Sequence, residues 1–82
     1  MLLGDFIKEL KHNSSWLEIR KNGYNELYDD PDDILLEGTL GVIKNNIYYQ
    51  KDYQNYSIGF LKVRYDKQMK CEFIIYIYKM EE

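Results

Sequence analysis

The stretch of sequence that decides the fold is residues 71–78, which read Cys-Glu-Phe-Ile-Ile-Tyr-Ile-Tyr. Successive side chains of a strand point to opposite faces, so Phe73 and Ile75 lie on one face while Ile74 lies on the other. Apolar side chains therefore occupy both faces. A strand of this kind is typical of the interior of a sheet, where both faces are covered. We predict a central β-strand over residues 71–80.

Other strands are predicted from the sequence that precedes this stretch. Residues 58–65 are also rich in β-forming side chains, and the polar residues 66–70 between the two stretches indicate a long hairpin. Residues 16–20 alternate apolar and charged side chains with the period of a half-buried strand. An Asn-Gly pair at 22–23 favours a tight turn that returns as a second strand over residues 24–28.

The amino-terminal residues have the period of a helix. Apolar side chains recur at the i, i+3, i+4 and i+7 spacing of one helical face, which predicts a helix over residues 3–12 with its apolar stripe at Leu3, Phe6, Ile7 and Leu10. Residues 34–37 are expected to form a short strand, after which Thr39 caps a short helical turn that Asn45 and Asn46 end. Residues 47–55 fit neither period clearly and are expected to be irregular.

These elements combine into a single domain over residues 1–82. A chain of 82 residues suffices for one modest core, and its sequence contains no repeat or linker that marks a boundary. We predict an α+β fold, in which the N-terminal helix packs on a small four- or five-stranded, mostly antiparallel sheet.

Composition restricts where the protein acts. Cys71 is the single cysteine of the chain, so it cannot form an intramolecular disulfide, and a reducing compartment is expected. No stretch approaches the roughly 20 apolar residues of a membrane span. The amino terminus also lacks the basic and then apolar order of a signal peptide. We expect a cytoplasmic protein that contacts no membrane.

The residue types that catalysis uses are sparse. His12 and Cys71 could form a nucleophile pair, but no motif surrounds either residue and no third group is available to orient the histidine. His12 is instead expected to cap the carbonyl end of the first helix, and Cys71 to fill a core position. We therefore predict that the protein is not an enzyme and that it needs no cofactor or metal ion.

The most distinctive local feature is a run of acidic residues around Pro31. Residues 29–38 contain five acids and no base, in a spacing that does not match a calcium-binding loop. Three interpretations stay open: a patch that meets a basic partner, a weak site for a hard cation, and a solvated turn that protects a sheet edge. The five acids are Asp29, Asp30, Asp32, Asp33 and Glu37.

Tyrosine is the second distinctive feature, with nine residues in the chain. Tyrosine is enriched at binding surfaces because it offers a large contact area with few rotatable bonds. The other interpretation is that AT-rich coding supplies tyrosine where other genomes use phenylalanine or leucine. One cluster is a candidate for partner binding, and its members are Tyr48, Tyr49, Tyr53 and Tyr56.

A basic segment follows. Residues 39–70 carry six bases and two acids, although the net charge of the whole chain is −3. Cations mixed with an aromatic residue suit single-stranded nucleic acid, while a solvated face is the other interpretation. The residues concerned are Lys62, Arg64, Tyr65, Lys67 and Lys70. Direct binding of nucleic acid is expected to be weak, because the acidic segment offsets the basic one.

Several segments resemble a known group of proteins. The opening at residues 3–11, the strand at residues 16–20 and the later segments at residues 37–40 and 73–77 resemble small uncharacterised phage and mobile-element proteins of low-GC Gram-positive bacteria. The helix-then-strand opening and the acidity are also similar to small anti-CRISPR inhibitors of Cas9, which cover basic nucleic-acid-binding surfaces with carboxylates. The resemblance implies a phage protein that acts in the host bacterial cytoplasm.

Three functions are compatible with these features. We expect a non-enzymatic binding protein of phage type that inhibits a host protein, such as a CRISPR effector, by presenting an acidic, tyrosine-rich surface to a basic site. One alternative is an accessory protein that binds nucleic acid through the basic hairpin at residues 62–70. The other is a structural module that assembles as a homodimer through its sheet edges.

Overall fold

The computed structural model describes residues 1–21 and 33–78. Helix α1 (Leu3–Glu9) precedes strands β1 (Trp16–Arg20) and β2 (Ile34–Thr39). Helices α2 (Leu40–Lys44) and α3 (Ile47–Lys51) and the 3-10 helix η2 (Tyr53–Asn55) lead to strands β3 (Ile58–Tyr65) and β4 (Cys71–Ile77). The predicted α+β fold is confirmed. The turn predicted at 22–23 and the strand predicted over 24–28 lie outside the described residues.

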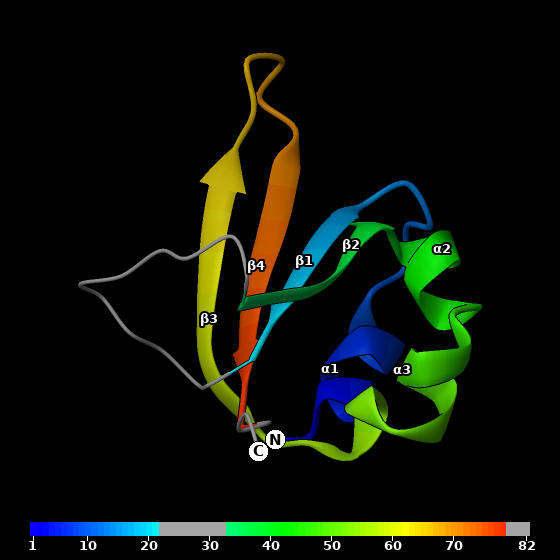
Figure 1. The fold of residues 1–82 in the computed structure, drawn as a ribbon. Coiled ribbons are helices and arrows are strands. Elements are labelled where there is room, and N and C mark those ends of the chain that lie inside the picture. Colours follow the sequence, from blue (N-terminus) through cyan, green and yellow to red (C-terminus); the bar gives the residue numbers. More distant parts are fainter. Residues whose placement is uncertain (22–32, 79–82) are drawn as a thin grey trace.

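The strands form one mixed sheet in the order β2-β1-β4-β3 (Figure 1). Strand β4 lies between β1 and β3, so its predicted central position is confirmed. Strands β1 and β4 are parallel, with Leu17 opposite Phe73 and Ile19 opposite Ile75. The other two pairs, β1 with β2 and β3 with β4, are antiparallel. The sheet is therefore mostly antiparallel, with a parallel pair at its centre.

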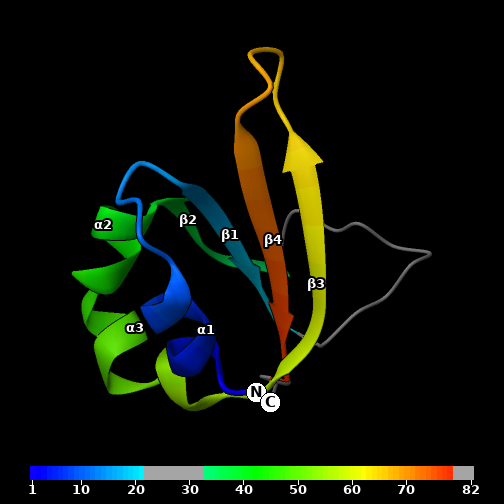
Figure 2. The same ribbon diagram turned by 180° about the vertical axis from the view of Figure 1, so that it is seen from behind.

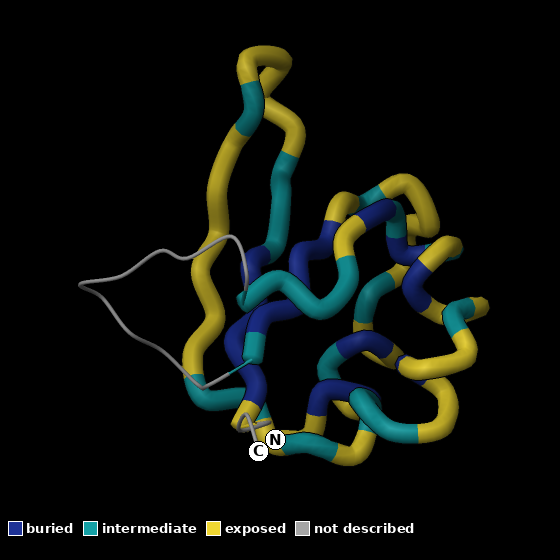
Figure 3. The backbone as a smooth tube through the Cα atoms, in the orientation of Figure 1, coloured by how far each residue is buried: buried dark blue, intermediate teal, exposed yellow. Residues whose placement is uncertain are grey.

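The helices cover one face of this sheet, and the core lies between the two layers (Figure 2). From the sheet, Leu17 and Ile19 of β1 and Ile75 and Ile77 of β4 are fully buried. Complete burial of one such side chain contributes about 1.5–3 kcal/mol. Figure 3 shows buried segments of helices and sheet facing one another across this core. The helical layer supplies the fully buried Leu3, Ile7, Leu40 and Ile43.

Two helix ends differ from expectation. Helix α1 stops at Glu9 instead of residue 12, because Leu10 adopts an extended backbone conformation. Thr39 lies directly before α2 as predicted, but its side chain makes no capping hydrogen bond. None of the described helices is long and apolar enough to cross a lipid bilayer.

The prediction that residues 47–55 are irregular is wrong, because α3 and η2 occupy most of this segment. Asn46 explains the difference. Its side-chain oxygen accepts hydrogen bonds from the backbone N–H groups of Tyr48 at 2.8 Å and Tyr49 at 3.2 Å. These bonds satisfy donors that a helix otherwise leaves unpaired at its first turn. The residue that we expected to end one helical turn therefore also begins the next helix.

The turn of the β3–β4 hairpin extends beyond the rest of the described fold (Figure 1). Asp66 organises this turn, since its carboxylate accepts hydrogen bonds from the backbone N–H groups of Gln68 and Lys70, both at 2.8 Å. Met69 has a φ of 61°, a left-handed conformation that favours glycine. The turn is thus held by local hydrogen bonds and contains one strained residue.

Candidate functional site

Strand β3 forms one edge of the sheet. Strand β4 pairs with one side of it, and within the described residues no strand pairs with the other side. The last six residues of β3, from Phe60 to Tyr65, are all exposed (Figure 3). An exposed edge strand of this length presents backbone N–H and C=O groups to which another strand can bind.

Three apolar side chains are exposed at alternate positions of this strand. Leu61, Val63 and Tyr65 are 38%, 46% and 61% exposed, and we call them the edge row. They share the face on which the helices pack, because Leu61 lies opposite the buried Ile75. The core does not reach them, since its buried residues come from α1, α2, α3, β1 and β4. The edge row is therefore an apolar surface on an edge strand, a combination typical of interaction sites.

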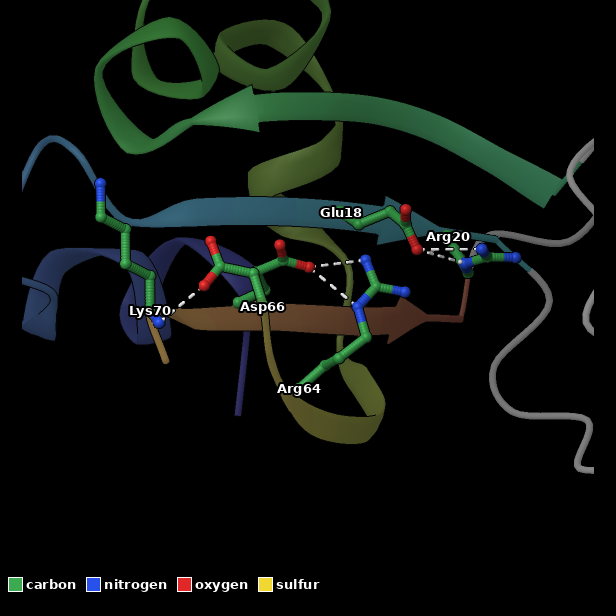
Figure 4. Close-up of polar contacts among 6 residues, drawn as sticks. Glu18, Arg20, Arg64, Asp66 and Lys70 are labelled. Atoms are coloured by element: carbon green, nitrogen blue, oxygen red, sulfur yellow. Dashed lines mark hydrogen bonds and ion pairs between the residues drawn. The ribbon is translucent and has the colours of Figure 1, made fainter. Parts of the chain in front are cut away.

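The opposite face of β3 is basic. Lys62 and Arg64 lie there by strand alternation. The Arg64 guanidinium binds the Glu72 carboxylate of β4, with its Nη2 2.7 Å and its Nε 2.8 Å from Oε2 (Figure 4). Tyr65 lies on the other face, with the edge row. Lys62 and Arg64 of the predicted nucleic-acid site are therefore separated from its tyrosine by the two faces of β3, while Lys67 and Lys70 lie in the exposed turn.

A buried ion pair on β1 was missed by the sequence predictions. Glu18 and Arg20 were expected on the solvated side of a half-buried strand, yet each side chain is only 8% exposed. Both Nε and Nη2 of Arg20 lie 2.9 Å from Oε2 of Glu18 (Figure 4). The Arg20 guanidinium also lies 5.9 Å from the centre of the Tyr76 ring. Loss of one partner would leave a buried charge and cost about 3–5 kcal/mol, so the pair is a structural feature.

The acidic part of the predicted partner surface is described only at its carboxyl-terminal end. Asp33 is half-buried, and its backbone carbonyl accepts a hydrogen bond from the Lys21 N–H at 2.9 Å. Glu37 is exposed on β2 and lies opposite Glu18, on the face that points away from the helices. The remaining acids lie outside the described residues, and their role stays a prediction: Asp29, Asp30 and Asp32.

The tyrosine cluster lies on the helix side of the sheet and is largely part of the core. Tyr49 is only 6% exposed, which corrects the prediction that it contacts a partner. Its burial raises the pKa of its hydroxyl group above the ordinary value of 10.0. Tyr53 and Tyr56 are half-buried against the core, and only Tyr48 of the four is well exposed. Because Glu37 faces away from the helices, these tyrosines and Glu37 do not form one continuous surface.

The two residues considered as a nucleophile pair line the same cavity. Helix α1 ends at Glu9 and Leu10 is its C-cap residue, so His12 does not occupy the capping position that was predicted for it. Cys71 is only partly buried and does not belong to the core, contrary to the prediction. The cavity has a volume of about 290 Å³, and its lining residues are His12, Ser14, Ser15, Lys70 and Cys71.

No protein-family model, curated protein or solved structure matches this chain. In the described part of the molecule two features stand out as candidate sites, the edge row of β3 and the cavity beside Cys71. The edge row offers a surface for a macromolecule, whereas the cavity offers room for a small ligand only.

Proposed function

We propose that this protein is a non-enzymatic binding protein whose strand β3 takes up an extended segment of a partner protein. The observation that carries the proposal is the edge row, three exposed apolar side chains on the outermost strand of the sheet. In strand addition, main-chain hydrogen bonds provide affinity and contacts to alternate side chains provide specificity. Recognition of this kind requires a surface and no catalytic group.

The two faces of β3 favour a segment in which apolar and acidic residues alternate. On one face, the edge row contacts every second residue of an added strand. On the other face, Lys62 is exposed and basic, and acidic side chains complement it. The same charge disfavours pairing of β3 with the β3 strand of a second copy, because like charges on adjacent strands repel. A protein segment is therefore better supported than a homodimer.

The expected affinity is modest. Complete burial of a Leu or Val side chain contributes about 1.5–3 kcal/mol, so covering the exposed part of each edge-row residue contributes about 1 kcal/mol. Each new main-chain hydrogen bond adds a net contribution of about 0.5–1.5 kcal/mol. Binding also costs translational and rotational freedom, which offsets much of this gain. We expect a dissociation constant that is micromolar or weaker, because 1 μM already requires about 8 kcal/mol of net binding free energy.

Strand addition at β3 would also explain how the protein inhibits a host protein, as the resemblance to phage inhibitors implies. A segment held on β3 is removed from whatever other contacts it makes in its own protein. Where that segment belongs to the working surface of a host protein, stoichiometric binding inhibits the host protein without chemistry. Nucleic acid is the less favoured ligand, because Tyr65 lies on the opposite face of β3 from Lys62 and Arg64, and Arg64 is bound to Glu72.

A pair of matched variants tests the proposal. Val63→Lys places a charge in the middle of the edge row, where it blocks an incoming apolar strand. Val42→Lys is the control, because Val42 is similarly exposed at 59% but lies on α2, away from β3. Random peptides displayed on a surface are selected against the wild-type protein, and the binding of enriched peptides to all three proteins is measured by fluorescence anisotropy.

We expect the enriched peptides to alternate apolar and acidic residues. Their affinity should fall about tenfold or more in Val63→Lys and stay unchanged in Val42→Lys, with both variants folded by circular dichroism. Peptides that bind Val63→Lys as tightly as wild type would contradict strand addition at the edge row. Concentration-dependent self-association of the wild type through β3 would instead support the homodimer. Submicromolar retardation of single-stranded DNA or RNA that weakens steeply with salt would support the nucleic-acid function.

A further inference from the structure

A cavity of about 290 Å³ lies where the loop before β1 meets the end of the hairpin turn. One wall comes from the loop, with His12, Ser14 and Ser15, and the other from Lys70 and Cys71. The parallel pairing of β1 with β4 brings the walls together, since each wall leads directly into the paired start of one of these strands. Segments far apart in sequence thus contribute to one site.

Hydrogen bonds of main-chain groups fix both walls, and in one of these bonds the acceptor is a side-chain carboxylate. In the loop, the Ser15 N–H donates to the His12 carbonyl at 3.1 Å, and the Ser15 carbonyl accepts from the Leu40 N–H at 2.8 Å. In the turn, the Lys70 N–H donates to the Asp66 carboxylate at 2.8 Å, and the Lys70 carbonyl accepts from the Asp66 N–H at 3.0 Å. A ligand therefore meets positioned backbone on both sides, which limits the entropy lost on binding.

The side chains that line the cavity are hydrogen-bond donors. Lys70 provides an ammonium group, the two serines provide hydroxyl groups, His12 provides a ring N–H and Cys71 a weak S–H donor. None of the described lining residues is acidic. Figure 4 shows the Lys70 side chain directed away from the Asp66 carboxylate, toward the start of β1. A positive charge among several neutral donors suits an anion whose oxygens accept multiple hydrogen bonds.

We propose that this cavity binds a small oxyanion, either inorganic phosphate or the phosphate group of a small monoester. The cavity is large enough for an anion of either kind. A metal ion is disfavoured, because among the described residues no group of three or more His, Cys, Asp or Glu side chains could hold one. The site adjoins the binding edge proposed on β3, because Tyr65 of the edge row lies opposite Cys71, but no edge-row residue lines the cavity.

The single cysteine of the chain gives a direct readout. Iodoacetamide is uncharged, so the rate at which it alkylates Cys71 reports access to the cavity without attraction to Lys70. At constant ionic strength, phosphate should slow alkylation about tenfold when it is present at about ten times its dissociation constant, whereas chloride should not. Amide chemical shifts of residues 12–15 and 70–71 should change with the same dissociation constant.

Two lysine variants provide the test and its control. Lys70→Gln removes the positive charge from the cavity and should weaken phosphate binding about tenfold, because a charge-assisted hydrogen bond is lost. Lys67→Gln removes the same charge from the same exposed turn, but Lys67 does not line the cavity, so protection of Cys71 should remain. Equal loss of protection in both variants would show nonspecific attraction and overturn the proposal.

Phosphoserine, supplied as the free amino acid, separates the two sources of the anion. Protection by phosphoserine as well as phosphate identifies the monoester group as a ligand, and protection by phosphate alone identifies the free ion. The absence of saturable protection with both compounds would overturn the proposal. Val63→Lys should keep full protection, so a failure of strand addition at β3 and a failure of this site are distinguishable.

Discussion

Replacing Met69 with glycine is predicted to stabilise the protein. In the described part of the chain Met69 is the only residue other than glycine with a positive φ. The left-handed conformation costs a residue with a Cβ about 1–2 kcal/mol, whereas glycine loses about 0.5–1 kcal/mol more backbone entropy on folding. Met69 is 76% exposed, so the substitution removes little packing. We expect a net gain of about 0.5–1 kcal/mol in the free energy of unfolding.

Thermal unfolding followed by circular dichroism measures this gain. For a domain of about 60–100 residues, 1 kcal/mol changes Tm by about 4–8 °C, so Met69→Gly should raise Tm by about 2–8 °C. Gln68→Gly is the matched control, because Gln68 is exposed in the same turn but has no positive φ. It should lose about 0.5–1 kcal/mol. A lower Tm for Met69→Gly, or equal effects of the two variants, would refute the assignment of strain to Met69.

Two further changes have signs that the structure determines. Gly4→Ala should lower the free energy of unfolding by about 1–3 kcal/mol, because its Cβ would lie 3.1 Å from the Gln54 carbonyl oxygen and force α1 away from η2. Gly41→Ala, within α2, should raise it by about 0.5–1 kcal/mol, because alanine favours a helix and the added Cβ would lie 3.8 Å from Asn13 Cβ, an ordinary contact. Urea unfolding compares the two variants. Burial raises the pKa of the Tyr49 hydroxyl in the folded protein above its ordinary value of 10.0. The folded state therefore holds this proton more tightly than the unfolded state, and the free energy of unfolding is highest below a pH of about 10 and falls as the pH rises through the folded pKa. Stability should therefore fall less between about pH 9 and pH 11 in Tyr49→Phe than in the wild type, and an equal fall would contradict the pKa shift.

The sheet was predictable where local pattern and burial agree. Apolar residues on both faces of β4 correctly predicted a central strand, because such a strand needs a neighbour on each side. The parallel pairing of β1 with β4 was not predictable, because parallel strands are usually recognised by a single helix that connects them, and several short elements connect these two strands. Asn46 was read as the end of one helical turn, but the same side chain also caps α3. Local signals of this kind do not distinguish a stop from a new start.

The candidate sites were less predictable than the fold. Strand alternation puts Leu61, Val63 and Tyr65 on one face of β3, but it does not show how far the helices extend over that face. The exposure of these side chains therefore depends on tertiary packing. The same packing buries Tyr49, which the sequence offered as a binding residue. The cavity beside Cys71 depends on the parallel register of β1 and β4, so it could not be predicted from the sequence.

Amide hydrogen exchange along β3 tests strand addition most directly. In a strand, the N–H groups that bond one neighbour alternate with those that point to the other side, so an added strand protects every second amide. With a selected peptide bound, we predict slower exchange at alternate residues of Ile58–Tyr65 and unchanged exchange at the residues between them, which already bond β4. Protection that appears on another element while the β3 amides exchange as in the free protein would contradict the proposal that β3 takes up a partner strand.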